Sequence, residues 1–426
     1  MAAVVRAVAL VLLCAFNLRT VLAAIGAAAA QVEQEMGAGG AVTGTVSAVS
    51  IVLIALGSPL ALRLERRFDV AAVVGASLVL TALAQAVLLV PGAWSIWSAA
   101  ALGGLGAGLL GTVLPAVVRA LMPRHAGPGV AMIMLGSSAG FYLASLAVPQ
   151  AVARTGSWRQ AALVLGAVAV VAAVVWTLAA RRGAPGPDTT ERAGTEDREA
   201  GSAWSTLRAA LGLPWLRLLT AFLAVQSMSV FAQIAWLVPT LVSRGVPAAQ
   251  AGVLLGAFSA FQLVTGLGAP LLAQRFGRLG TLCAAAGCTL GLGALAMLTL
   301  PMSGSGGPGT LVTWATVIVL AFGHGASFAL VNFAIADVSA DARAAVGAGA
   351  AIMLVSQAAG ASGPLLFGAL RDASDGYAVP WLVLLLLAGI QTALGLGTRR
   401  ALRRAEPSGG GGRTRALARS SPGPAA

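Results

Sequence analysis

The first long apolar stretch of this 426-residue chain, residues 7–30, contains a single charged side chain, Arg19, near its middle. An arginine at the centre of a membrane-spanning helix costs about 2.5–3.5 kcal/mol on insertion scales, so a charge kept there needs a reason. Its guanidinium offers a permanent positive charge and a planar fork of donors, which suits a small planar anion or an electron-rich ring. Asn17 adds an amide that donates or accepts hydrogen bonds. We therefore expect Arg19 and Asn17 to bind a small anionic or polar compound; the alternative is that Arg19 only donates to free carbonyls of a broken neighbouring helix.

His324 is the other titratable side chain that lies within an apolar stretch. It stands between Gly323 and Gly325, two small residues that allow another helix to approach closely. An unperturbed imidazole has a pKa of about 6.5 and changes its charge near physiological pH. Three roles remain open for His324: contact with the bound compound, acceptance of a coupled proton, or plain packing.

Acidic side chains are missing from the middle of the apolar stretches, because the 14 Asp and Glu residues fall in loops, at the ends of these stretches, in a polar linker or in the tail. A buried acidic site for a proton or a sodium ion is therefore not expected, and an uncompensated Arg19 favours anionic or neutral compounds over cations. Cys14, Cys283 and Cys288 lie in apolar segments and indicate neither a disulfide framework nor a metal site. No metal and no cofactor are expected.

Composition places these residues in a membrane. The chain is 58% hydrophobic and 10% charged, whereas a soluble globular protein carries about 25% charged residues. A spanning helix needs about 20 apolar residues, and twelve stretches meet that need: residues 7–30, 41–62, 70–90, 97–118, 127–150, 160–180, 214–238, 248–272, 279–300, 310–334, 345–369 and 378–398. We predict an all-α polytopic membrane protein, which excludes a secreted disulfide scaffold, a disordered chain and an ordinary cytosolic enzyme.

A long polar stretch divides the twelve segments into two sets of six. Residues 181–213 mix Pro, Gly and charges of both signs, and are predicted to be a cytoplasmic linker. The domain organisation is therefore a six-helix bundle over 1–180, the linker, a second six-helix bundle over 214–398 and a disordered cytoplasmic tail over 399–426.

The arginines predict an orientation. All 27 basic residues are Arg, and their scatter at loop positions argues against nucleic-acid binding despite the net charge of +13. The segments on the same side as the N-terminus carry Arg63, Arg66, Arg67, Arg119, Arg124, Arg181, Arg182, Arg275, Arg278, Arg343, Arg399, Arg400, Arg403 and Arg404. The opposite loops carry Arg154, Arg159, Arg244 and Arg371. The positive-inside rule then predicts a multi-pass protein of the plasma membrane with both termini in the cytoplasm.

The two halves also resemble each other. At a constant offset of 208 residues, Gly44 matches Gly252 and residues 67–68 match 275–276. At an offset of 219, residues 104–107 match 323–326, and six of nine positions are identical between 131–139 and 350–358. Two Ala-rich helices agreeing by chance is the alternative. A parallel repeat of six plus six helices is typical of a secondary transporter with a central site between the halves.

The repeat adds residues to the expected site. Gln226 lies in the seventh segment, the counterpart of the first, and so is expected to face Arg19. Tyr142 and Gln357 lie in the fifth and eleventh segments, which are also counterparts. Most intramembrane polar groups bridge helices rather than bind a ligand, which is the competing interpretation of all three. Trp236, near the outer end of the seventh segment, is expected to be an interfacial anchor.

Five pieces of the chain resemble the major facilitator superfamily and, within it, the cyanate and 2-nitroimidazole transporter branch (CynX/NimT). They are Asn-Leu-Arg at 17–19, Gly-Ser-Trp-Arg at 156–159, and residues 235–258, 323–328 and 363–372, in that order. The resemblance covers nearly the whole chain apart from the linker and the tail. It implies the major facilitator fold of two six-helix bundles and the movement of a small compound such as cyanate or a nitroimidazole, in a direction that it does not choose.

Two loops are expected to gate the resulting states. They follow the second and eighth segments and carry Arg63, Arg67, Asp69, Arg275 and Arg278. Asp69 stands where loops of the superfamily usually have Gly, whereas the second-half loop keeps Gly277. His324 stands where Gln is expected in relatives. The difference at Asp69 bears on how the loop gates the two states, and the difference at His324 bears on which compound is bound.

We predict a secondary active transporter that works by alternating access on a small anionic or polar compound. Its partners are that compound, the lipid bilayer and, if His324 titrates, coupled protons; a monomer is expected. Multidrug-type efflux of neutral molecules and a transporter-derived membrane sensor remain alternatives. An integral-membrane enzyme is disfavoured, because the outer loops are short and poor in carboxylates and histidines that could catalyse a reaction.

Overall fold

The computed structural model describes residues 2–65, 67–122, 126–181, 214–304, 306–338 and 342–405, and all regular secondary structure within them is helical. Residues 182–213 of the predicted linker and 406–426 of the predicted tail lie outside the described residues. The first seven residues of the predicted tail, 399–405, differ from the expectation, because they continue the last helix. That helix therefore ends after the arginine-rich segment and not before it.

Twelve helical segments of the described residues are long and apolar enough to cross a membrane, which confirms the all-α, twelve-span prediction. The first half contains α1 (Ala2–Phe16), α2 (Thr20–Ala27), α3 (Ala29–Met36), α4 (Gly40–Glu65), α5 (Val70–Leu88), α6 (Ala93–Leu121), α7 (Ala126–Thr155) and α8 (Gln160–Arg181). The second half contains α10 (Pro214–Ser243), α11 (Ala248–Phe276), α12 (Leu279–Thr299), α13 (Pro308–Val338), α14 (Ala342–Ser374) and α15 (Ala378–Ala405).

The first span is interrupted, whereas the apolar pattern predicts one helix over 7–30. Helix α1 ends at Phe16, and the N–H groups of Asn17 and Leu18 reach back only three residues, to the carbonyls of Cys14 and Ala15. Arg19 has φ −132° and ψ 7°, outside the helical region, and α-helical bonding resumes with Ala23 donating to its carbonyl at 3.0 Å. The amide of Asn17 donates to the Leu13 carbonyl at 2.9 Å. Such local side-chain bonds compete with the backbone ladder and favour a break.

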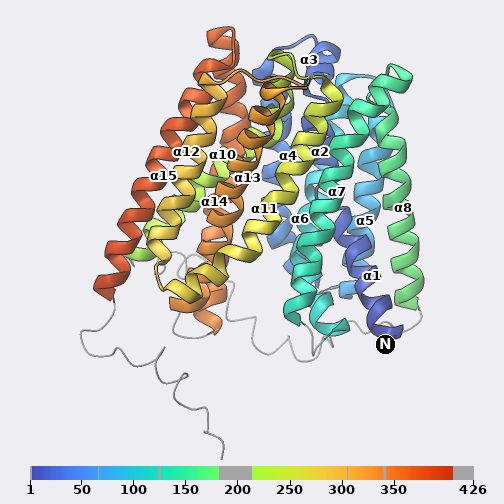
Figure 1. The fold of residues 1–426 in the computed structure, drawn as a ribbon. Coiled ribbons are helices and arrows are strands. Elements are labelled where there is room, and N and C mark those ends of the chain that lie inside the picture. The colour runs from blue at the N-terminus through green and yellow to red at the C-terminus, as the bar shows by residue number, and fades with distance from the viewer. Residues whose placement is uncertain are drawn as a thin grey trace, which may run out of the picture.

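The two halves lie side by side, with α3 at one end of the bundle (Figure 1, top) and the N-terminus and the end of α15 at the other. We call these the α3 end and the N-terminal end. Across the boundary, α4 packs on α14 and α7 packs on α11. These two contacts are equivalents in the repeat: Gly44 of α4 touches the carbonyl of Pro364, and Gly252 of α11 touches the carbonyl of Ser145. The offset of 208 residues relates Gly44 to Gly252, and the offset of 219 relates Ser145 to Pro364.

Close packing corrects one register of the repeat. In the first half, Gly106 and Gly108 of α6 lie against the carbonyls of Ser77 and Ile54. In the second half, Gly323 and Gly325 of α13 lie against the carbonyls of Ala286 and Gln262 on the equivalent helices α12 and α11. The equivalent glycines are therefore 217 residues apart. The expected match of 104–107 with 323–326 is wrong by two residues, and the offset changes to 219 at the turn into the next helix.

The hydrophobic cores show which end of the molecule is closed. One core at the α3 end contains residues of both halves, among them Ile25 and Trp158 from the first half and Trp236 and Trp381 from the second. Toward the N-terminal end there are two separate cores, one built from the first half alone and one from the second half alone. Apolar burial thus joins the halves at the α3 end and holds each half together separately at the other end.

Candidate functional site

Arg19 occupies the break between α1 and α2, within the span Val5–Ala27. All eight residues of α2 are buried, and the helix is surrounded by α4, α6 and α7 of its own half and α10 of the other. The side chain of Arg19 is nevertheless exposed. Among the side chains that the structure describes, none forms an ion pair or a hydrogen bond with it. Helix α2, which follows Arg19 directly, is enclosed by neighbouring helices, so Arg19 adjoins a buried part of the bundle.

Asn17 is buried, 2% exposed, and lies on the other side of the break. Its Nδ2 is used by the Leu13 carbonyl, while Oδ1 has no partner among the described residues. A small pocket adjoins it, lined by Asn17, Leu18, Val21, Leu22, Ser50, Ile54, Gly103, Gly104 and Ala107. Helices α4 and α6 form its far wall, where Ser50 donates to the Ala100 carbonyl at 3.1 Å. Asn17 therefore offers a hydrogen-bond acceptor beside the break.

His324 and Gln226 are brought together in the second half. His324 is fully buried on α13, with Nδ1 3.4 Å from Nε2 of Gln226 on α10. The ring of Phe258 on α11 meets the imidazole edge to face at 5.7 Å between centroids. Nε2 of His324 has no partner among the described residues. An amide that donates to Nδ1 selects the tautomer with a proton on Nε2, so the pair presents a buried N–H that lacks an acceptor.

Tyr142 and Gln357 are both half-buried and lie on different helices, α7 and α14. The ring of Tyr142 packs against Gly256 of α11, so this side chain belongs to the boundary between the halves. Gln357 lies one residue from Ser356, whose hydroxyl donates to the Ile352 carbonyl within α14. Of the six predicted residues, the structure brings Gln226 into contact with His324, while Arg19 and Asn17 share the break in the first span.

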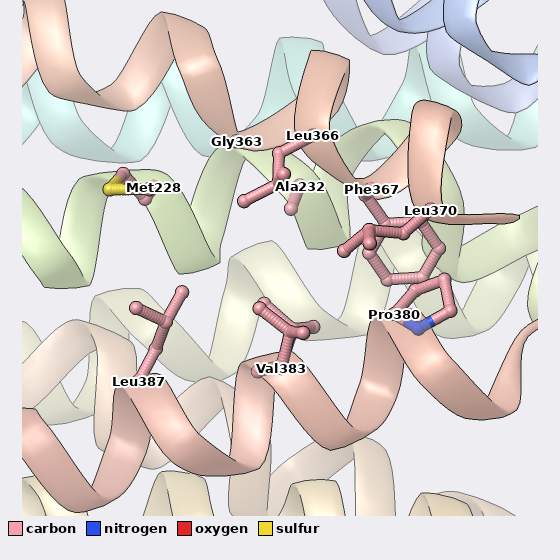
Figure 2. A pocket seen from close by; sticks show the side chains of 10 residues that line it. Met228, Ala232, Gly363, Leu366, Phe367, Leu370, Pro380, Val383 and Leu387 are labelled. Atoms are coloured by element: carbon pink, nitrogen blue, oxygen red, sulfur yellow. The ribbon is translucent and has the colours of Figure 1, made fainter. Parts of the chain in front are cut away.

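A second pocket lies away from these residues, between α10, α14 and α15 (Figure 2). Its walls are apolar side chains that converge from the three helices, with Phe367 and Leu370 of α14 facing Pro380 and Val383 of α15 in the close-up. Among the residues that the structure describes, no charged or hydrogen-bonding side chain lines it. Such a groove suits an alkyl chain and offers no group that could recognise an anionic or polar compound.

The predicted gating loops lie at the N-terminal end. Arg63, Arg67, Asp69, Arg275 and Arg278 are all exposed, and none makes an ion pair with a side chain that the structure describes. The departure at Asp69 has a visible consequence. Gly277 has φ 58° and ends α11 in the left-handed conformation, whereas Asp69, its counterpart, has φ −60° and ψ 145° and precedes α5 in extended conformation. The two loops therefore differ in backbone conformation at equivalent positions.

A charged cluster at the α3 end was not among the expected sites. Arg371 of α14 donates to both carboxylate oxygens of Glu33 on α3, at 2.8 and 2.9 Å. Its guanidinium also lies over the rings of Trp236 and Tyr377, at 5.7 and 5.4 Å. Trp236 is fully buried here, which makes the expected interfacial anchor wrong. Sequence reasoning missed this cluster, because the Gly39–Gly40 pair and residues 371–372 are far apart in the chain and only the fold brings them together.

The pKa values of the two carboxylates on α3 are shifted in opposite directions. Burial raises the pKa of Glu33 above the usual carboxyl range, although the charge and hydrogen bond of Arg371 partly oppose this. Burial also raises the pKa of Glu35, but hydrogen bonds from Arg159 and from the Gly92 N–H outweigh it, so the pKa of Glu35 lies below the usual range. Arg159 donates as well to the carbonyls of Leu88 and Val90 at the end of α5.

The described residues contain no group of three or more His, Cys, Asp or Glu side chains that could hold a metal ion. Cys14 and Cys283 are free and buried, and Cys288 is free and exposed. The arrangement therefore offers binding groups of three kinds: an unpaired guanidinium, an unpartnered amide oxygen and a buried imidazole N–H. Together these suit reversible binding of a small molecule rather than covalent chemistry.

Comparison with known proteins gives one family. A family model described as Major Facilitator Superfamily matches residues 9–405. An uncharacterized transporter of Bacillus subtilis, YycB, is 26% identical over 394 residues, covering 91% of each chain. The 2-nitroimidazole transporter of Escherichia coli is also 26% identical, over 356 residues, covering 83% of this chain and 85% of the relative.

Solved structures have the same fold. A bacterial homologue of the human lysosomal transporter Spinster, in an inward-facing and unoccupied conformation, superposes with a TM-score of 0.74 at 13% identity, covering 94% of this chain and 98% of that one. A D-xylose–proton symporter superposes with a TM-score of 0.71 at 13% identity, covering 92% and 97%.

Proposed function

Since the chain belongs to the major facilitator superfamily and is a membrane transporter rather than an enzyme, we propose that it moves a small anionic or polar compound by alternating access. The observation that carries this proposal is Arg19 at the break of the first span, which has no partner among the described side chains. A guanidinium inside a bundle and without a protein counter-ion is stabilised by an anionic or electron-rich ligand. The expected site residues Arg19, Asn17, Gln226, His324, Gln357 and Tyr142 form the proposed binding region.

The arginine bias supports an orientation for this cycle. Arg63, Arg67, Arg275 and Arg278 are exposed at the N-terminal end of the bundle, and arginines concentrate on the cytoplasmic side of membrane proteins. We therefore place the α3 end outside and both termini in the cytoplasm of a cell with this protein in its plasma membrane. The joined core at the α3 end and the separate cores at the other end then correspond to an inward-facing state.

The substrate class is small, planar and rich in hydrogen-bond acceptors. The 2-nitroimidazole transporter that matches this chain supports a compound with a nitro group or an equivalent pair of oxygens. Such a group fits the two parallel N–H donors of a guanidinium. A cyanate-like anion is the second member of this class. The Gln226–His324 pair, from the other half, supplies further hydrogen bonds when the halves close around the compound.

The test is counterflow in proteoliposomes that contain the purified protein. Labelled cyanate and 2-nitroimidazole are each offered at two pH values, against excess unlabelled compound inside. Accumulation of either compound supports the proposal, and a dependence on pH identifies coupled protons. Accumulation of neutral hydrophobic dyes together with no accumulation of either polar compound favours multidrug-type efflux instead.

Arg19→Ala is the matching variant. We expect a loss of counterflow of about tenfold or more, because an ion pair or charge-assisted hydrogen bond is worth about 1.5–3 kcal/mol. Thermal unfolding in detergent provides the control, since Arg19 makes no bond to a described side chain whose loss would destabilise the fold. Counterflow at the parental rate by the folded variant contradicts the role of Arg19.

A further inference from the structure

Helix α3 is a short polar helix between the first and second spans, and it carries two carboxylates two residues apart. A separation of two residues places side chains about 200° apart around a helix, so Glu33 and Glu35 point in opposite directions. Each meets an arginine, and the two arginines belong to different halves of the molecule: Arg371 of α14 and Arg159, which precedes α8. Helix α3 therefore bridges the two halves at the end where they are joined.

The contact between α3 and its own half is built to persist. Arg159 is 8% exposed, and it donates to the Leu88 and Val90 carbonyls as well as to both oxygens of Glu35. Glu35 also accepts from the N–H of Gly92 at 2.8 Å. Every one of these partners lies in the first half, so a movement between the halves leaves this network unchanged. Helix α3 is thus attached to the first half.

The contact between α3 and the other half crosses the boundary. Glu33 receives Arg371 of α14 through two hydrogen bonds, and the side chains of this pair are 17% and 25% exposed. One residue on, Asp372 accepts from the N–H groups of Gly40 and Ala41, at 2.9 and 2.8 Å. Those N–H groups are the free donors at the start of α4, where the helix dipole favours a carboxylate. A residue of the second half therefore caps a helix of the first.

Glycine makes this approach possible. A Cβ at position 39 would lie 2.6 Å from the carboxylate of Asp372, and one at position 40 would lie 2.8 Å from the ring of Trp236. Both side chains belong to the second half. The absence of side chains at 39 and 40 therefore leaves room for Arg371, Asp372 and Trp236 when the two halves are in contact.

The Glu33–Arg371 ion pair and the Asp372 cap lie at one of the two equivalent boundaries between the halves. The offset of 219 residues relates Arg371 and Asp372 to Val152 and Ala153 of α7, which have no charge. The start of α11, the counterpart of α4, accordingly has no carboxylate cap from the other half: Tyr142, Ser145 and Pro149 contact Gly252 and Gly256 there. Among the described residues, an ion pair to α14 lies beside the α4–α14 boundary, and none joins α7 to α11.

We infer that α3 is a lid carried by the first half, and that Glu33–Arg371 together with the Asp372 cap on α4 is a gate that must break each time the α3 end opens. This inference rests on the proposed alternating access. In the open state the charges of Glu33, Arg371 and Asp372 are hydrated, while Glu35–Arg159 remains intact. Removing a gate carboxylate therefore weakens the closed state of that end without loosening the attachment of α3.

The buried position of Ser47, near the gate, provides a site at which opening can be measured by cysteine labelling. Ser47 follows Gly40 and Gly44 at helical spacing on the face of α4 toward α14; it is 1% exposed, and its Oγ has no partner among the described residues. The parent variant for the assay is Ser47→Cys with Cys288→Ser, which leaves Cys14 and Cys283 buried. The rate at which a fluorescent maleimide labels the purified protein in detergent reports how often the α3 end opens. The assay needs no substrate and no assumed orientation, so its outcome is independent of the counterflow test.

Added to this parent, Glu33→Gln and Asp372→Asn should each raise the labelling rate about fivefold, which corresponds to about 1 kcal/mol less stability of the closed state. Glu35→Gln is the matched control and should leave the rate unchanged. The double variant Glu33→Arg with Arg371→Glu restores an ion pair with exchanged charges, so its labelling rate should be closer to that of the parent than the rate of Glu33→Gln. Unchanged rates in both gate variants, or an equal increase in the control, overturn the inference.

Discussion

At the scale of single residues, the two arginines that meet α3 and the arginine at the break illustrate different uses of one side chain. Arg159 satisfies carbonyls at the end of α5 and a carboxylate, and so holds a helix in place. Arg371 joins two halves. Arg19 has no partner among the described side chains. An arginine within a membrane span requires a counter-charge or hydrogen-bond acceptors, and we propose that the transported compound supplies them to Arg19.

Acid should weaken the Glu35 contact selectively. The pKa of Glu35 lies below its ordinary value in the folded protein because hydrogen bonds from Arg159 and Gly92 outweigh the effect of burial. Its contribution to stability is therefore present above the ordinary carboxyl pKa and is lost as the pH falls through the lowered value. We expect Glu35→Gln to lower the free energy of unfolding by about 1 kcal/mol at neutral pH and to lose this difference in acid, as measured by thermal unfolding in detergent.

Glu33→Gln is the matched comparison, because the pKa of Glu33 is shifted in the opposite direction and its contribution to stability depends on pH with the opposite sign. Burial raises the pKa of Glu33, so its contribution to the free energy of unfolding is present below the ordinary carboxyl pKa and is lost as the pH rises through the raised value. The difference between Glu33→Gln and the parent should therefore not shrink toward acid in the way that the Glu35→Gln difference does. Identical pH profiles for the two variants contradict the assignment of these two environments.

At the scale of helices, small residues decide where the halves touch. Gly44 on α4 and Gly252 on α11 occupy equivalent positions against carbonyls of α14 and α7. Without side chains at these positions, the backbones approach closely, which is how helices associate in membranes. The same device fixes α6 and α13 within their own halves, at Gly108 and Gly325. Glycine position thus determines both the fixed and the separable contacts.

Leucine at either boundary glycine should hold the α3 end open. Gly44→Leu and Gly252→Leu each place a side chain where the structure has a carbonyl of the other half. Spin labels at Thr155 and Ser374, both exposed at the α3 end on different halves, should then report a longer distance by pulsed electron resonance. Gly75→Ala is the control, because a Cβ there meets only the Trp176 ring at 3.8 Å. An unchanged distance in both leucine variants contradicts the role of these glycines.

At the scale of the whole molecule, apolar burial is distributed unevenly between the two ends. One core joins both halves at the α3 end, and each half has its own core toward the N-terminal end. Each half can therefore remain folded when the shared core separates, because the core toward the N-terminal end does not depend on the other half. This is the physical basis for rigid halves that move against each other.

The orientation of the molecule has a direct test. A cysteine at Ser374, exposed at the α3 end, should react in intact cells with a maleimide that does not cross the membrane. A cysteine at Arg278, exposed at the N-terminal end, should react only after the membrane is permeabilised. Both variants carry Cys288→Ser. The reverse pattern contradicts the orientation predicted from the arginine bias.

The sequence by itself determined the number of spans and the pairing of the halves, because apolar length and repeated residues are local properties of the chain. It also singled out Arg19, since a charge near the centre of an apolar span is recognised from its position in the sequence. The glycine register of α6 and α13 was decided by packing against neighbouring helices. The pairing of Glu33 with Arg371 joins residues 338 positions apart. Such pairings depend on which helix ends meet when two bundles close, and the tertiary structure alone determines that.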